Sequence, residues 1–385
     1  MIRSRGDIKQ VGRLVVKIGS SLLADEKSGL KADVVARLVD EVAALIRRGL
    51  DVAVVTSGAV ALGRVHMGWV GRSLSVHEKQ AAAAIGQPLL MHAYSESFAR
   101  HDLAVAQLLL TKDDLRNRRR YLNASNTSQT LFSAGVVPIV NENDTVVVAE
   151  IKFGDNDTLG ALTSLVVDAE LMVMLTDVDG LYEADPAEQA SARRIGEVAA
   201  LTPEILAMAG DAGSHFGTGG MASKLKAARM ATRGGVAAAV IGGNRPGALA
   251  RLLAGEDEGT LFLCGTDRQA RRKHWIAELL APAGILRIDA GAERALLSQG
   301  SSLLPIGLTG VEGVFDKGEC VEVVGPSGRV ARGLANYNGE EMRRLIGVAS
   351  QDIEDVLGYR DFSSVIHRDN LVLCRQEKEK GASDE

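Results

Sequence analysis

The first 260 or so residues alternate between short β-branched runs and segments whose apolar residues recur at helical spacing. The runs predicted to be strands are residues 14–18, 52–56, 104–110, 136–140, 171–175 and 237–241, and residues 260–263 close the series. Strands that alternate with helices form parallel sheets, and right-handed crossovers place helices on both faces. We therefore predict an α/β domain over residues 10–264, with a mainly parallel central sheet between two helix layers.

The pattern changes beyond residue 264. Residues 265–283 are charged and are interpreted as a linker. From residue 284 to 362, short β runs follow one another closely and are punctuated by glycines, which is typical of a small β-barrel-like domain. Residues 376–385 are polar and charged, and we predict a disordered tail there.

Charge and composition exclude several classes of protein. A net charge of −5 argues against a protein built to coat nucleic acid. The cysteines Cys264, Cys320 and Cys374 lie far apart, without the spacing of a zinc site, and indicate a reducing compartment. No apolar run reaches the roughly 18 residues that a membrane span needs, and no signal peptide is visible. The expectation is a cytoplasmic protein without a membrane segment.

A glycine-rich stretch at residues 217–220 runs directly into a predicted helix that carries Lys224. Glycines let the backbone approach a ligand closely, and a helix N-terminus offers free N–H groups to phosphate. The order of residues is not that of a Walker A loop. Taken alone, the stretch fits a phosphate-binding loop and an ordinary connector about equally well.

Polar residues also follow several predicted strands, where ligands of parallel sheets gather. Lys17 ends the first strand, and Asp157 opens a later helix. With Lys224, the two lysines could hold a transferring phosphoryl group while Asp157 orients them. The alternatives are a strand-end lysine that reaches solvent and an acid that is favoured by the helix dipole. No nucleophile signature accompanies the histidines, and an ionised carboxylate acceptor would need no base, so a carboxylate kinase fits better than an alcohol kinase.

Several motifs carry a resemblance to a known family. The pair Asn-Glu-Asn-Asp (residues 141–144) and Gly-Asp-Asn-Asp (154–157), with Gly-Thr-Gly-Gly-Met (217–221), resembles the glutamate 5-kinases, or γ-glutamyl kinases. The strand–Lys–Gly start at residues 15–21 and the Thr-Asp pair at 176–177 fit the wider amino-acid kinase family. Residues 285–347 resemble the PUA domain attached to bacterial members.

The resemblance implies ATP-dependent phosphorylation of the side-chain carboxylate of L-glutamate, the first step of proline biosynthesis, with Mg²⁺. It assigns catalysis to Lys17, Lys224 and Asp157, and no residue to the metal. It assigns glutamate binding to Ser57, Asp144 and Asn156, with Asn141 as a weaker candidate. It assigns nucleotide binding to Lys17, Gly19, Thr176, Asp177, Thr218, Gly219, Gly220, Met221, Ala222, Ser223 and Lys224.

The resemblance also implies partners. These are proline as a feedback inhibitor, a homo-oligomer (dimer or tetramer), and a hand-off of the unstable acyl phosphate to a glutamyl phosphate reductase. Two rival functions stay open at this point. One is another acid or nucleotide kinase of the same fold, and the other is RNA binding by the PUA domain, against which the net charge argues. The C-terminal domain could equally serve regulation or assembly.

Overall fold

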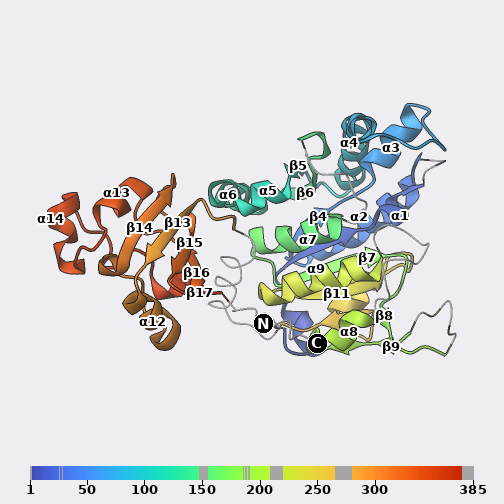
Figure 1. Cartoon of the computed structure of the whole chain (residues 1–385). Helices are drawn as coiled ribbons and strands as arrows, with labels where there is room; N and C mark the ends of the chain where they lie inside the picture. The colour runs from blue at the N-terminus through green and yellow to red at the C-terminus, as the bar shows by residue number, and fades with distance from the viewer. Residues whose placement is uncertain are drawn as a thin grey trace, which may run out of the picture. The chain divides into compact units, whose positions relative to one another are not determined.

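The chain divides into two compact units (Figure 1). The computed structural model describes residues 2–25, 27, 29–146, 155–184, 186, 189, 191–208, 220–264 and 280–374. The larger unit holds the described residues up to 264 apart from 116–118, and the smaller unit holds 116–118 and 280–374. No helix within these ranges has the length and apolarity that would let it cross a membrane.

Eight strands of the larger unit form one sheet, and every neighbouring pair is parallel except β11 with β12. In spatial order they are β10 (Glu197–Val198), β12 (Thr260–Phe262), β11 (Ala237–Gly242), β7 (Leu171–Thr176), β1 (Arg13–Ile18), β4 (Asp51–Val55), β6 (Val137–Glu142) and β5 (Val105–Leu110). The prediction of a mainly parallel sheet is confirmed.

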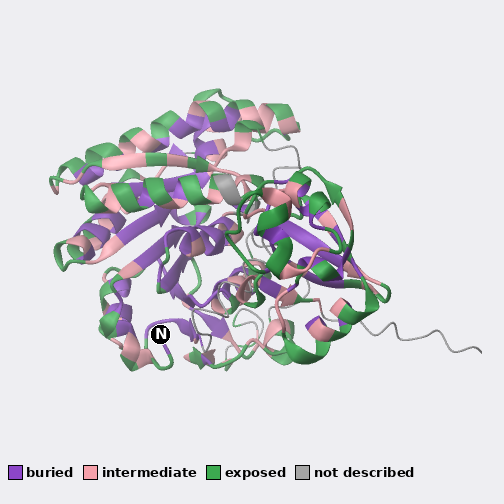
Figure 2. Ribbon diagram, turned by 90° about the vertical axis from the view of Figure 1, so that its left-hand side faces the viewer, coloured by how far each residue is buried: buried purple, intermediate pink, exposed green. Residues whose placement is uncertain are grey.

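Helices cover both faces of this sheet. On one face, the inward residues of β1 and its neighbours pack with the 3₁₀-helix η1 (Arg5–Gln10), α1 (Ser20–Leu23), α2 (Ala32–Arg47), α4 (Val76–Ala99) and α10 (Ala248–Leu253). On the other lie α6 (Arg118–Ser133), α7 (Asp155–Val166) and α9 (Met221–Arg233), with α7 beside α9 (Figure 1). Buried residues accordingly concentrate in the sheet and on the inner sides of the helices (Figure 2). The two predicted helix layers are therefore confirmed.

Helix α3 (Ala59–His66) lies unusually close to α4. A Cβ atom on Gly63 would come within 1.8 Å of the carbonyl oxygen of Ala82, and one on Gly86 within 1.8 Å of that of Ala59. Only glycine therefore permits this crossing. The start of α4 is fixed by a capping box between Ser75 and Glu78, as the sequence predicts.

The remaining elements of the larger unit are short. They are β2 (Ala24–Asp25), β3 (Gly29–Leu30), α5 (Lys112–Arg116), η2 (Asp144–Val146), β8 (Leu181–Tyr182), β9 (Arg194–Ile195) and α8 (Pro203–Ala207). The alternating sequence of residues 145–151 predicts an edge hairpin. In the structure, however, Thr145 and Val146 belong to η2. The Asn143 side chain accepts a hydrogen bond from the Thr145 hydroxyl at 2.7 Å, which favours a turn there. Residues 147–151 lie outside the described residues.

The smaller unit is built on five strands in the order β14-β13-β15-β16-β17. They are β13 (Gly284–Ile288), β14 (Leu308–Gly313), β15 (Cys320–Gly325), β16 (Gly328–Leu334) and β17 (Leu371–Leu373). Its helices are α12 (Ala290–Gln299), η4 (Pro305–Gly307), α13 (Gly339–Arg344), η5 (Ser350–Asp352), α14 (Ile353–Leu357) and η6 (Arg368–Asn370). Strand β17 lies beyond residue 362, the expected end of this domain, and pairs with β16, so the sheet continues further than the sequence indicates. Residues 265–279 of the predicted linker and the predicted tail at 376–385 lie outside the described residues.

Candidate active site

Lys17 lies near the carboxyl end of β1, a central strand of the larger sheet. It pairs with Val55 on β4 and Met174 on β7, so its backbone is fixed on both sides. The stem of its side chain contacts α7 at Gly160, where a Cβ atom would lie 3.3 Å from that of Lys17. Lys17 is only 5% exposed, so the predicted alternative of a lysine that reaches into solvent is wrong.

Asp157, in the first turn of α7, brings the two predicted lysines together. Its Oδ1 lies 2.5 Å from the Nζ of Lys17, and its Oδ2 lies 3.6 Å from the Nζ of Lys224. The hydroxyl of Ser223 donates to the same Oδ2 at 2.6 Å. Asp157 is fully buried, and the side chains of the lysines are 7% and 6% exposed. One carboxylate thus holds two ammonium groups that come from opposite ends of the domain sequence.

Two buried cations, Lys17 and Lys224, share the buried carboxylate of Asp157, and Asp177 also acts electrostatically on Lys224. Burial alone would raise the pKa of Asp157, but Lys17 and Lys224, with the Ser223 hydrogen bond, hold it below its usual range. Burial lowers the pKa of Lys224, although the nearby Asp157 opposes this change. The two ammonium groups lie at the carboxyl edge of the sheet, where an anionic group would stabilise them.

The described end of the glycine-rich stretch leads into α9. Gly220 is the N-cap, and Met221, Ala222, Ser223 and Lys224 form the first turn of the helix. Ser223, predicted to bind nucleotide, places its hydroxyl within reach of Asp157 and of the Gly220 carbonyl oxygen, at 2.6 and 2.8 Å. Gly217, Thr218 and Gly219 lie outside the described residues.

Gly19 and Thr176 lie together where β1 and β7 end. The N–H of Gly19 donates to the Leu175 carbonyl at 3.0 Å, and a Cβ atom on Gly19 would come within 3.2 Å of that oxygen. Thr176 is buried and its hydroxyl donates to Asp177, which is exposed, at 2.9 Å. These predicted nucleotide-binding residues therefore share the edge of the sheet with Lys17.

The side-chain amide of Asn156 connects the predicted substrate residues. Its Nδ2 lies 2.9 Å from the Thr56 carbonyl oxygen, 3.1 Å from the Ser57 hydroxyl and 3.2 Å from Oδ1 of Asn141. Asn141 is 2% exposed and donates from its own Nδ2 to Oε1 of Gln87 at 2.7 Å. The structure thus brings Ser57, Asn141 and Asn156 together.

Gln87 is a member of this cluster that the motifs do not identify. It lies within α4, far from any strand end, and no polar neighbour in sequence marks it. The signal in the sequence is a polar residue followed by Pro88 inside an alanine-rich helix. A proline cannot donate the helical hydrogen bond to the residue four positions earlier, so such a pair marks an irregular turn.

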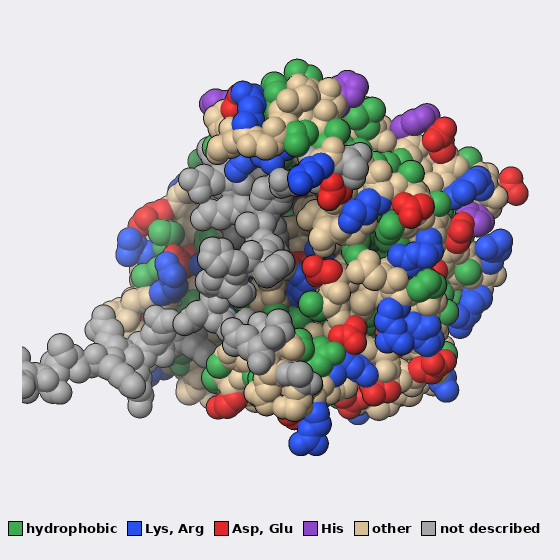
Figure 3. Space-filling model, turned by 90° about the vertical axis from the view of Figure 1, so that its right-hand side faces the viewer, with side chains coloured by type: hydrophobic (Ala, Val, Ile, Leu, Met, Phe, Trp, Pro, Cys, Tyr) green, Lys and Arg blue, Asp and Glu red, His purple; other side chains and the backbone are tan. Residues whose placement is uncertain are grey.

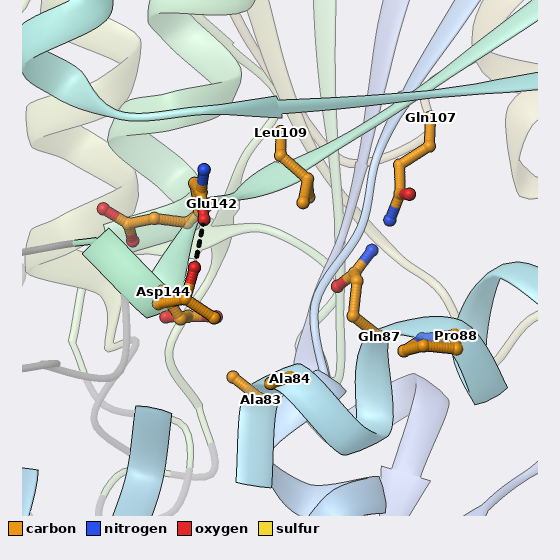
Figure 4. A pocket seen from close by; sticks show the side chains of 10 residues that line it. Ala83, Ala84, Gln87, Pro88, Gln107, Leu109, Glu142 and Asp144 are labelled. Atoms are coloured by element: carbon orange, nitrogen blue, oxygen red, sulfur yellow. Dashed lines mark hydrogen bonds between the residues drawn. The ribbon is translucent and has the colours of Figure 1, made fainter. Parts of the chain in front are cut away.

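Asp144 lies on the wall of a pocket of about 270 Å³, which Gln87 of the amide cluster also lines (Figure 4). Gln87 and Gln107 lie on one side of this pocket and Asp144 on the other. The rest of the lining is Ala83, Ala84, Pro88, Leu109, Glu142, Asn143 and Thr145. Burial raises the pKa of Asp144 to about 6. A cationic group that entered the pocket would restore the ionised form of this carboxyl.

The described residues contain no group of three or more histidine, cysteine, aspartate or glutamate side chains that could hold a metal ion. Magnesium bound with nucleotides keeps most of its ligands on phosphate and water, and takes one or two carboxylates at most. The described residues therefore assign no ligand to a magnesium ion.

The fold and this site define a phosphoryl-transfer enzyme of the amino acid kinase type. Residues 12–243 match the model of the amino acid kinase family, and residues 284–357 match that of the PUA domain. The glutamate 5-kinase of Trichlorobacter lovleyi is 51% identical over 370 residues, which cover 96% of this chain and 98% of that protein. The glutamate 5-kinase of Chromohalobacter salexigens is 50% identical over 371 residues, with the same coverage.

The chain belongs to the glutamate 5-kinase family of kinases and carries a C-terminal PUA domain. Among solved structures, a UMP kinase from Bacillus anthracis matches 66% of this chain and 97% of its own, at 15% identity and a TM-score of 0.48. That similarity is too low to support a conclusion.

Proposed function

We propose that the protein transfers the γ-phosphoryl group of ATP to the side-chain carboxylate of L-glutamate, which gives L-glutamyl 5-phosphate and ADP. The observation that carries this proposal is the buried Asp157 between the ammonium groups of Lys17 and Lys224. A phosphoryl group in transfer has little covalent help and depends on position and neutralised charge. Two lysines from different elements of the fold supply both the positioning and the neutralising charge.

The acceptor needs no general base in this reaction. A carboxylate with a pKa of about 4.3 is ionised at neutral pH and attacks as it stands. The difficulty is that it must approach a polyanionic phosphate, and the positive charge of the two lysines lowers that barrier. A carboxylate acceptor therefore suits a site whose chemistry rests on cations.

Asp144, Ser57 and Asn156 are proposed to hold the amino-acid end of glutamate. The carboxylate of Asp144 would pair with the substrate ammonium. Ser57 precedes α3, whose N-terminus favours a substrate carboxylate. Asn141 would act with Asn156, to which it is hydrogen-bonded.

Thr176, Asp177 and residues 218–224 are proposed to contact ATP. The proposal is supported by the position of the described members of this set, which lie at the edge of the sheet beside Lys17. Mg²⁺ bound to the phosphates would neutralise charge that the two lysines do not reach.

An acceptor panel tests the function. ADP release is measured with glutamate, aspartate, N-acetylglutamate and UMP, and hydroxylamine traps any acyl phosphate as a hydroxamate. We expect turnover and hydroxamate with glutamate, at least about a hundredfold above the other acceptors, because aspartate misplaces the acceptor carboxylate, N-acetylglutamate lacks the ammonium charge, and UMP offers a phosphate instead of a carboxylate. Faster turnover with any other acceptor contradicts the proposal.

Family membership supports four further proposals. Proline, which shares the ammonium and carboxylate of glutamate, would inhibit by competing at the Asp144 pocket. The chain would form a homo-oligomer in the cytoplasm, and the labile acyl phosphate would pass to a glutamyl phosphate reductase. Inhibition kinetics test the effect of proline, light scattering tests the oligomer, and the rate of the coupled reaction against that of the separated enzymes tests the hand-off.

The PUA domain leaves a second candidate activity, RNA binding. The face in Figure 3 carries basic and acidic side chains interspersed over its described residues. The net charge of −5 of the whole chain argues against RNA binding and favours a regulatory or assembly role for the domain. Tight, salt-sensitive binding of structured RNA in a filter assay would support the RNA-binding activity instead.

A further inference from the structure

Gln87 accepts a hydrogen bond that fixes the orientation of a buried amide. Its Oε1 lies 2.7 Å from Nδ2 of Asn141, and the two residues are 8% and 2% exposed. An amide has a donor end and an acceptor end, and a half-turn exchanges them. Because the Nδ2 end of Asn141 is bound to Gln87, its Oδ1 end points to Asn156.

That orientation of Asn141 determines the orientation of Asn156. The Nδ2 of Asn156 faces three acceptors, which are the Thr56 carbonyl, the Ser57 hydroxyl and Oδ1 of Asn141. If Asn141 turned over, two NH₂ groups would face each other, which is unfavourable in a buried site. With Nδ2 engaged in this way, Oδ1 of Asn156 is the atom left to receive a donor, such as the ammonium group of an amino acid.

Gln87 also faces the pocket that contains Asp144. Its own Nε2 is buried, and no acceptor within the described ranges contacts it. A buried donor without an acceptor costs about 1–3 kcal/mol. A residue retained only for stability would not carry this cost, so a role in binding is favoured over a packing role.

We propose that Gln87 is a positioning residue for the amino-acid substrate. It holds Asn141, and through Asn141 it holds Asn156 with the amide oxygen presented to the substrate ammonium. This inference rests on the proposed function, since it takes glutamate as the substrate. Its effect belongs to substrate binding rather than to phosphoryl transfer, because Gln87 contacts neither Lys17, Lys224 nor Asp157.

Steady-state kinetics of Gln87→Met test the proposal. Methionine keeps the length of the side chain and removes the acceptor. We expect the KM for glutamate to rise about tenfold to a hundredfold. The kcat at saturating glutamate and the KM for ATP are expected to stay within about threefold, since neither depends on the amide chain. Ser97→Ala is the matched control, because Ser97 is equally buried on the same helix and should change no kinetic constant.

A double-mutant cycle shows whether Gln87 acts through Asn141. The KM for glutamate is measured for Gln87→Met, Asn141→Leu and the double variant. If Gln87 acts only by holding Asn141, the double variant has the KM of Asn141→Leu alone. Multiplying effects would mean that the two residues act independently and would overturn the proposal.

Two further measurements distinguish a positioning role of Gln87 from a purely structural one. They are the KM of Gln87→Glu and the melting temperature of the variants. Glutamate keeps an oxygen acceptor for Asn141, so its KM should lie nearer the wild-type value than that of Gln87→Met. A wild-type KM in Gln87→Met, or a fall in kcat and in the melting temperature with no separate change in KM, overturns the inference. Wild-type protein that does not turn over glutamate at all contradicts the proposed function instead, so the two failures are distinguishable.

Discussion

Lys17 and Lys224 are held by one carboxylate, so removing one lysine leaves a neutral ion pair behind. We therefore expect Lys224→Ala to fold normally while its kcat falls by about a hundredfold to a thousandfold, the cost of losing one group that stabilises the transition state. Steady-state kinetics and circular dichroism of the variant measure the two effects. A kcat within a factor of three of wild type would remove Lys224 from catalysis.

Asp157→Asn presents the opposite case, since it leaves two buried cations without their counter-ion. Breaking a buried pair in this way costs about 3–5 kcal/mol of unfolding free energy. We expect urea denaturation to show a loss of that order, together with a loss of turnover. Stability equal to that of Lys224→Ala would show that Asp157 does not hold the lysines together.

The raised pKa of Asp144, about 6, predicts the pH dependence of substrate binding. The protonated carboxyl cannot pair with an ammonium, so kcat/KM for glutamate should fall about tenfold per pH unit below 6 and level off above it. Asp144→Asn should have a low kcat/KM that does not change over this range. A wild-type profile that stays flat from pH 5 to 8 would contradict the role of Asp144.

The strand-end motifs identify most of this site, because the carboxyl ends of neighbouring parallel strands must meet. Lys17, Asp157 and Lys224 are brought together as the sequence predicts. Gln87 is missed because it reaches the site from the middle of a helix, and its role depends on where α4 crosses the sheet. Side-chain periodicity carries no information on that crossing.

At the scale of the elements, the crossing of α3 and α4 is the tightest contact described above. Gly86→Ala would normally stabilise a helix, because alanine has the higher helix propensity. Here the new methyl group would meet the Ala59 carbonyl at 1.8 Å, so we expect a loss of at least about 2 kcal/mol in urea unfolding. Gly6→Ala is the control, because its nearest neighbour would be at 3.6 Å. Equal stabilities of these two variants would contradict the close packing.

The elements that the sequence predicts best are those with a strong local pattern. The six parallel strands β11, β7, β1, β4, β6 and β5 lie where the sequence predicts them, and α7 and α9 lie where it predicts helices with Asp157 and Lys224. A local sequence pattern does not predict a structure that depends on which other strand a segment pairs with. Strand β12 runs antiparallel to β11, and β17 is a strand only because it pairs with β16. The turn at Asp144–Val146 replaces a predicted strand, and the hydrogen bond from the Thr145 hydroxyl to the Asn143 side chain favours this turn.

At the scale of the whole molecule, every described residue of the candidate site belongs to the larger unit, which has its own core. We expect a chain that ends at residue 264 to keep glutamate-dependent ADP release, with kcat and both KM values within about threefold of the full chain. The same assay on both proteins measures this. A loss of turnover in a truncated chain that remains folded would assign the PUA domain a part in catalysis.

The shared carboxylate has a consequence for a chain that is still being made. Lys17 enters the sheet with the first strand, Asp157 follows near the middle of the domain, and Lys224 arrives with one of its last helices. Synthesis proceeds from the N-terminus, so no shorter nascent chain possesses the full charge cluster. Under the proposed function, full nucleotide turnover therefore begins only when the sheet is nearly finished.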